Sequence, residues 1–135
     1  MFSQNKLSKK LPFIIGLFLL INLCSCGFAY EKRITGKYYI IGVDTEEDLG
    51  LSYKLGSGDY VGKAPGQLLQ YGNNDTFLVA KTQAYKNSNQ AFYIIDMTKD
   101  SELAHEETFR IGPLTEEEYN RSWKQKLNIQ LSDVK

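Results

Sequence analysis

The chain has 135 residues, with 16 Lys and Arg, 16 Asp and Glu, one His and two Cys. This length suits one domain, and a hydrophobic content of 42% is typical of a globular protein, so a multidomain enzyme, a disordered tail and a disulfide scaffold are excluded. Three of the basic residues and none of the acidic ones lie in the first 26, which leaves 13 basic and 16 acidic residues and a net charge of −3. No basic field remains to hold nucleic acid.

The N-terminal region has the layout of a secretory signal. Residues 1–10 are polar and basic, whereas 11–23 are almost wholly apolar. This apolar run of about 13 residues is shorter than the about 20 that a helix needs to cross a bilayer. A basic start, a short apolar core and small residues after it are typical of a signal-peptide helix, expected here over 1–25. Because the basic end stays in the cytoplasm, the rest is predicted to be exported.

The segment Leu23-Cys24-Ser25-Cys26 follows the apolar run and resembles the lipobox of bacterial lipoproteins. The resemblance implies that Cys26 receives a diacylglyceryl thioether and that signal peptidase II cuts before it. Cys24 fits less well as the modified residue, because bulky Leu23 would precede the cut. Two or more acyl chains anchor a protein stably. The expected partner is therefore membrane lipid, held through Cys26 on the extracytoplasmic side of the cell membrane or the outer membrane.

The resemblance to a lipobox also predicts whether the mature chain keeps a free cysteine. The resemblance implies that Cys24 leaves with the signal and that lipid takes up the sulfur of Cys26, so we expect no free thiol from the chain's two cysteines. A cysteine nucleophile, a thiolate metal site and an intramolecular disulfide are excluded together.

The mature region is predicted to be mainly β, in the α+β class. A lipidated polar tether is expected over 26–33, followed by a single domain over 34–135. Short segments rich in β-branched and aromatic residues predict strands at 37–43, 51–55, 60–63, 67–71, 76–82 and 91–97. Acidic, Gly-rich or Asn-rich turns separate these segments. Such spacing predicts a small antiparallel β-meander or barrel.

One C-terminal helix is expected at about 115–127. Thr115 and Glu118 have the spacing of a capping box, and the acidic first turn complements the helix dipole. Tyr119, Trp123 and Leu127 recur every four residues and form one apolar stripe. A helix this short is marginal alone, so the stripe is predicted to pack on the sheet.

Two groups of polar residues invite a metal or catalytic interpretation. The loop 44–48 begins like an EF-hand calcium loop, but Leu49 stands where that loop needs Gly, and Leu55 where it needs Glu. A solvated hairpin turn is the alternative, and cation binding by this loop stays open. His105 precedes two Glu residues, but the metalloprotease pattern needs a second His where Phe109 stands. The sequence therefore predicts neither a metal site nor a cofactor.

Ser57, Gly58 and Tyr60 match a short motif in another class of exported protein. The run Ser57-Gly58-Asp59-Tyr60 resembles the Ser-Gly-x-Tyr motif of periplasmic lysozyme-inhibitor lipoproteins, in which the motif helps to block the enzyme's active site. That family usually carries cysteines that this chain lacks. An ordinary β-turn is the alternative interpretation of the same residues.

Aromatic residues are the most distinctive feature of the mature chain, with nine Tyr, seven Phe and one Trp in the whole sequence. Tyrosine combines an apolar ring with a polar tip, which suits binding surfaces, although strands also favour Tyr for packing alone. The candidate binding surface comprises Tyr38, Tyr39, Tyr60 and Tyr71. In adjacent pairs such as Tyr38-Tyr39 and Phe92-Tyr93 the two rings face opposite sides of the sheet.

These features predict a lipid-anchored extracytoplasmic protein with a non-enzymatic binding or accessory role at the cell envelope and an envelope protein as partner. An enzyme is not expected, because no set of His, Cys or paired carboxylates has catalytic spacing. The alternative is an inhibitor or immunity protein against a secreted hydrolase such as lysozyme. The run Gly112–Tyr119 after a Tyr- and Ile-rich strand is also similar to small bacterial envelope lipoproteins with a β-rich domain and a closing helix.

Overall fold

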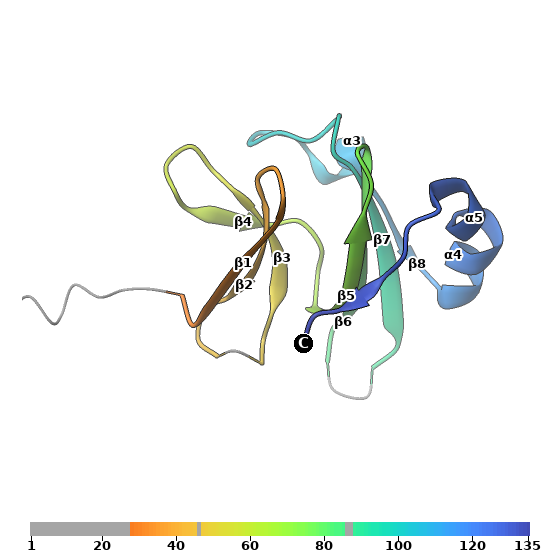
Figure 1. The fold of residues 1–135 in the computed structure, drawn as a ribbon, viewed down its shortest axis with the longest axis horizontal. Helices are drawn as coiled ribbons and strands as arrows, with labels where there is room; N and C mark the ends of the chain where they lie inside the picture. Colours follow the sequence, from red (N-terminus) through yellow and green to blue (C-terminus); the bar gives the residue numbers. More distant parts are fainter. Residues whose placement is uncertain (1–27, 46, 86–87) are drawn as a thin grey trace, which may run out of the picture.

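Two antiparallel sheets and three short helices make up the described part of the structure, a computed structural model that describes residues 28–135 except 46 and 86–87. Figure 1 shows three layers, with the first sheet and the helices α4 and α5 on opposite sides of the second sheet. The mainly β class is confirmed, and the strands form two sheets with a common core between them. The signal-peptide helix expected over 1–25 and the acylated Cys26 lie outside the described residues.

The first sheet has the strand order β1-β2-β3-β4. Its strands are β1 (Tyr30–Thr35), β2 (Tyr38–Gly42), β3 (Gly50–Lys54) and β4 (Tyr60–Gly62). The expected tether over 26–33 is too long, because β1 begins at Tyr30. Its run of charged residues, Glu31, Lys32 and Arg33, is typical of a polar linker, yet the strand pairs with β2 from Tyr30 to Thr35, with a register shift between Arg33 and Thr35. The charges of this edge strand discourage pairing with other chains.

The second sheet has the order β8-β7-β6-β5-β9. Its strands are β5 (Gln67–Asn73), β6 (Phe77–Gln83), β7 (Gln90–Asp96), β8 (Arg110–Leu114) and β9 (Ser132–Asp133). Alternate residues of β6 face opposite layers: Leu78 packs into the core between the sheets, and Val79 packs under the helices. Burial of both faces explains why β6 and β7 read as continuous apolar runs.

The core between the sheets is built from the inward-facing residues of both. Ile40 and Leu51 of the first sheet face each other across β2 and β3, and both are almost fully buried. Leu78 and Ile95 of the second sheet are paired in the same way and are fully buried. Burial of each such side chain stabilises the fold by about 1.5–3 kcal/mol. This core holds the two sheets together.

Helices α4 (Glu116–Ser122) and α5 (Lys124–Leu127) replace the single helix expected over 115–127. The capping box at Thr115 is confirmed: its hydroxyl accepts from the backbone N of Glu118 at 3.1 Å, and the Glu118 carboxylate accepts from the Thr115 N–H. Trp123 has φ −124°, which interrupts the helix between the two segments.

The predicted apolar stripe packs on the second sheet, as expected. Tyr119 and Leu127 are buried in a cluster with Val79 and Ile94, and Trp123 is half-buried against it. The ring of Tyr119 stacks on Phe92 with a centroid distance of 4.5 Å and an interplanar angle of 6°. One ring of the Phe92-Tyr93 pair is thus covered by the helix.

Besides β1, three further elements were not expected from the sequence: the short helix α3 (Glu106–Phe109), β8 and β9. The C-terminal strand β9 pairs with β5 after the chain has crossed over Gly72. A Cβ at Gly72 would collide with the backbone oxygen of Gln130 and lie 2.8 Å from Cγ2 of Ile129. Glycine at this position therefore lets the C-terminal segment lie directly on the second sheet.

We expect Gly72→Ala to lower the free energy of unfolding by about 1–3 kcal/mol, because the added methyl group overpacks a site closed by backbone atoms. Gly62→Ala is the matched control, since a Cβ there meets nothing within 4 Å. Chemical unfolding followed by the fluorescence of Trp123 measures both. Equal loss of stability in the two variants would contradict the close approach at Gly72.

Candidate functional site

Aromatic side chains gather on the face of the first sheet that points away from the second sheet. Tyr39 of β2 and Tyr60 of β4 lie with ring centroids 5.4 Å apart, and Phe28 meets Tyr60 at 5.1 Å, both edge to face. We call this surface, formed by Phe28, Tyr39, Tyr60 and Lys54, the outer aromatic face. Strand pairing puts Lys54 directly opposite Tyr60, so their side chains leave the same side of the sheet.

Charged groups fix the rings of the outer aromatic face. The Nζ of Lys54 lies 5.6 Å from the centre of the Tyr39 ring and 5.9 Å from that of Tyr60, within cation–π range. The Tyr60 hydroxyl donates a hydrogen bond to the carboxylate of Glu31 on β1. Burial and this hydrogen bond raise the pKa of Tyr60 to about 12, so its hydroxyl is neutral at ordinary pH.

The four tyrosines of the predicted binding surface do not form one surface. Tyr39 and Tyr60 lie together on the outer aromatic face, but Tyr38 is 4% exposed and belongs to the core between the sheets. The β-alternation that places Tyr39 outside requires Tyr38 to point inward. Tyr71 packs half-buried against the same core, where its hydroxyl accepts a hydrogen bond from Lys32 at 3.2 Å. Sequence reasoning missed Phe28 and Lys54, which take their places on this face.

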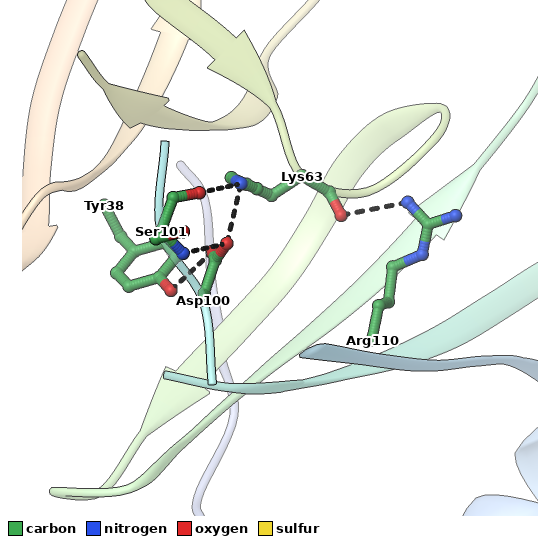
Figure 2. Close-up of polar contacts among 5 residues, drawn as sticks. All are labelled: Tyr38, Lys63, Asp100, Ser101 and Arg110. Carbon is green, nitrogen blue, oxygen red and sulfur yellow. Dashed lines mark hydrogen bonds and ion pairs between the residues drawn. The ribbon is translucent and has the colours of Figure 1, made fainter. Parts of the chain in front are cut away.

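A second cluster of polar groups lies inside the molecule, around the carboxylate of Asp100 (Figure 2). This carboxylate accepts hydrogen bonds from the Tyr38 hydroxyl at 2.7 Å, from Lys63 Nζ at 2.8 Å and from the backbone N–H of Ser101 at 2.8 Å. The side chains of Lys63 and Asp100 are 3% and 0% exposed. A buried pair of charges is tolerated only with such additional hydrogen bonds.

Aromatic rings complete the surroundings of Lys63. Its Nζ lies 4.3 Å from the centre of the Phe109 ring and 4.9 Å from that of Tyr53. Its backbone oxygen accepts a hydrogen bond from Arg110 at 3.1 Å. Burial, and then the hydrogen bond to Asp100, raise the pKa of Tyr38 above its usual range. These groups engage one another, so the cluster links the two sheets and offers no free base or nucleophile.

A surface pocket of about 440 Å³ adjoins this cluster and contains the chain's single histidine. His105 lines the pocket together with Glu102, Glu106 and Glu107. Two of these carboxylates are already engaged: Glu102 accepts from the backbone N of Gly56, and Glu106 pairs with Arg110 at 2.7 Å. His105 and these three glutamates are exposed. The pocket thus brings a histidine near carboxylates, but in an open, solvated position.

The other candidate residues lie in turns. In the acidic loop 44–48, the Thr45 hydroxyl accepts from the backbone N–H groups of Glu47 and Asp48, and residue 46 lies outside the described part. Ser57 and Gly58 are exposed at the tip of the β3–β4 hairpin, where the Ser57 hydroxyl donates to Asp59 at 3.2 Å. Within residues 28–135, leaving aside 46 and 86–87, no group of three or more His, Cys, Asp or Glu is arranged to hold a metal ion.

Comparison with known protein families, with curated proteins and with solved structures finds no match for this chain. Among the described helices, none has the length and apolar character to cross a membrane.

Two buried tyrosines provide a matched test of the polar cluster. We expect Tyr38→Phe to lower the free energy of unfolding by about 1–3 kcal/mol, because Asp100 and its neighbours lose a buried hydrogen bond. We expect Tyr119→Phe to be neutral or stabilising, because the buried Tyr119 hydroxyl has no hydrogen-bond partner within the described part of the chain. Urea unfolding measures the free energy of unfolding of both variants. If Tyr119→Phe lost as much stability as Tyr38→Phe, the hydrogen bond from Tyr38 to Asp100 would not be the cause of the Tyr38→Phe loss.

The contribution of the Lys63–Asp100 ion pair can be tested by replacing lysine with methionine at Lys63 and, as a control, at Lys99. We expect Lys63→Met to cost about 3–5 kcal/mol, because it leaves the buried Asp100 carboxylate without its counter-ion. Lys99→Met removes the partner of Asp96 from a pair at 3.8 Å in which the lysine is 64% exposed, and should cost less than about 1 kcal/mol. Adding Asp100→Leu to Lys63→Met should restore part of the lost stability. No recovery in the double variant would show that the lysine contributes by packing alone.

Proposed function

We propose that this protein is an extracytoplasmic lipoprotein, anchored in a membrane by acyl chains on Cys26, with a non-enzymatic binding or accessory role at the cell envelope. The observation that carries the proposal is the order of features at the N-terminus: a basic segment, a short apolar run and Leu23-Cys24-Ser25-Cys26. An envelope protein is the partner expected for the folded domain.

The position of the first strand supports this proposal. β1 begins at Tyr30, four residues after Cys26, so cleavage before Cys26 removes no residue of either sheet. The two cysteines of the chain both lie before the first strand. The domain that would remain is therefore free of thiols, and its stability comes from two apolar cores.

The surface of the domain supports a binding role. The outer aromatic face combines partly exposed tyrosine rings with a lysine and a carboxylate, which is the chemistry of recognition surfaces. By contrast, the buried Lys63 and Asp100 are engaged by each other and by their neighbours. Non-covalent contact, with membrane lipid or with a protein, is the activity that the outer aromatic face favours.

We expect Cys26→Ser to abolish acylation, because the thioether needs the sulfur atom. Cys24→Ser is the matched control and should leave acylation intact. Intact mass of the protein isolated from its native membrane measures the outcome: the expected product starts at residue 26 and carries fatty chains. A product that retains Met1, or one that is acylated equally well after Cys26→Ser, would overturn the proposal.

An inhibitor of a secreted hydrolase is the second candidate function. It is favoured by the exposed tip of the β3–β4 hairpin, which carries Ser57 and Gly58 of the Ser-Gly-x-Tyr motif. The Tyr60 of that motif instead lies on the outer aromatic face, bonded to Glu31. Lysozyme activity measured with and without the purified protein tests this candidate, and an unchanged rate of hydrolysis would remove lysozyme as the target.

A further inference from the structure

We propose that the outer aromatic face docks on the phospholipid headgroup layer of the membrane that holds the anchor. This inference rests on the proposed acylation of Cys26. It adds an orientation: the first sheet lies against the lipid, and the helices α4 and α5 point away from it. The face is thus a membrane contact, and the partner protein is bound elsewhere on the domain.

The length of chain between the anchor and the fold carries the argument. Phe28, whose ring packs on Tyr60, is two residues from Cys26. Two residues span at most about 7 Å. A domain of this size has a radius of gyration of about 13 Å, so the tether is shorter than the domain is wide. The surface near Phe28 is therefore held within reach of the headgroups.

The side chains around Phe28 have the chemistry of a membrane interface. Tyrosine rings with polar tips are enriched at the headgroup level of membrane proteins. Phe28 is 42% exposed, and Tyr39 and Tyr60 are half-buried beside it. The Lys54 ammonium, which lies over the two tyrosine rings, can reach lipid phosphates.

The arrangement of layers decides which side of the domain faces away from the lipid. In Figure 1 the described chain starts at the left, on the side of the first sheet opposite to the second, whereas α4 and α5 lie at the far right. Anchoring at the start of β1 therefore brings the outer aromatic face toward the bilayer. The exposed surface of α4, with its three first-turn glutamates, faces the aqueous space.

A single introduced thiol can report this orientation, because the acylated chain has none of its own. We would place cysteine at Arg33, on the outer side of β1, or at Glu117, on the exposed side of α4. The full acylated protein, labelled with a fluorophore at one of these sites, is reconstituted in phosphatidylcholine vesicles that contain headgroup spin-labelled lipid. We expect strong quenching at Arg33→Cys and little at Glu117→Cys.

Substitutions in the face test whether its rings make the contact. Adding Tyr39→Ser and Tyr60→Ser to the Arg33→Cys protein should reduce the quenching severalfold. Adding Tyr85→Ser is the control, because Tyr85 is 80% exposed but lies in the turn after β6. Thermal unfolding of each variant shows whether the domain is still folded, and hydrogen exchange of unsubstituted protein in vesicles and in detergent gives a second measure of protection at β4.

The outcomes separate the docking from the anchor. Intact mass establishes acylation independently of quenching. Equal quenching at the two labelled sites in an acylated protein, together with unchanged exchange at β4, would overturn the docking and leave the anchor standing. A protein without fatty chains would overturn both proposals.

Discussion

Burial of the second sheet on both of its faces determines the architecture of this protein. β6 and β7 carry apolar side chains on each side, and neither side can remain in water without loss of hydrophobic stabilisation. The first sheet covers one side, and α4 and α5 cover the other. Consequently, the outer side of the first sheet is the sheet face that no other layer covers in the described part of the chain. The aromatic residues on that face are therefore available for contacts outside the domain.

The buried polar cluster complements the apolar cores, because it adds hydrogen bonds and an ion pair between segments that are far apart in the sequence. Lys63 comes from the connection between the sheets, Asp100 from the connection after β7, and Tyr38 from the first sheet. An ion pair in such a place contributes geometry more than net stability, since desolvation offsets much of its attraction. Lys63 directly follows β4. The cluster thereby fixes the strand whose other end carries Tyr60 on the outer aromatic face.

The sequence predicted the parts of the fold that depend on local patterns. The capping box at Thr115 and the apolar stripe from Tyr119 involve residues a few positions apart, and both are present. β1 was missed because its run of three charged residues resembles a linker, and only pairing with β2 shows it as a strand. The Lys63–Asp100 pair was missed because its members are 37 residues apart, each in an ordinary polar turn. The alternation of side chains along a strand shows that Tyr38 and Tyr39 face opposite sides of the first sheet. Which of the two is buried depends on where the second sheet packs, and the sequence does not show this.

The same reasoning determines where a protein partner can bind if the first sheet lies on lipid. The surfaces that remain in water are the exposed side of α4 and α5 and the end of the molecule around α3. The end around α3 carries the pocket with His105 and three glutamates. Carboxylates that face the aqueous space favour a partner with a basic surface, through long-range attraction that weakens as salt increases. The net charge of −3 outside the first 26 residues acts in the same direction. If the proposed anchor and lipid contact are both present, the glutamates of the pocket around α3 are left in water, where they favour a basic partner.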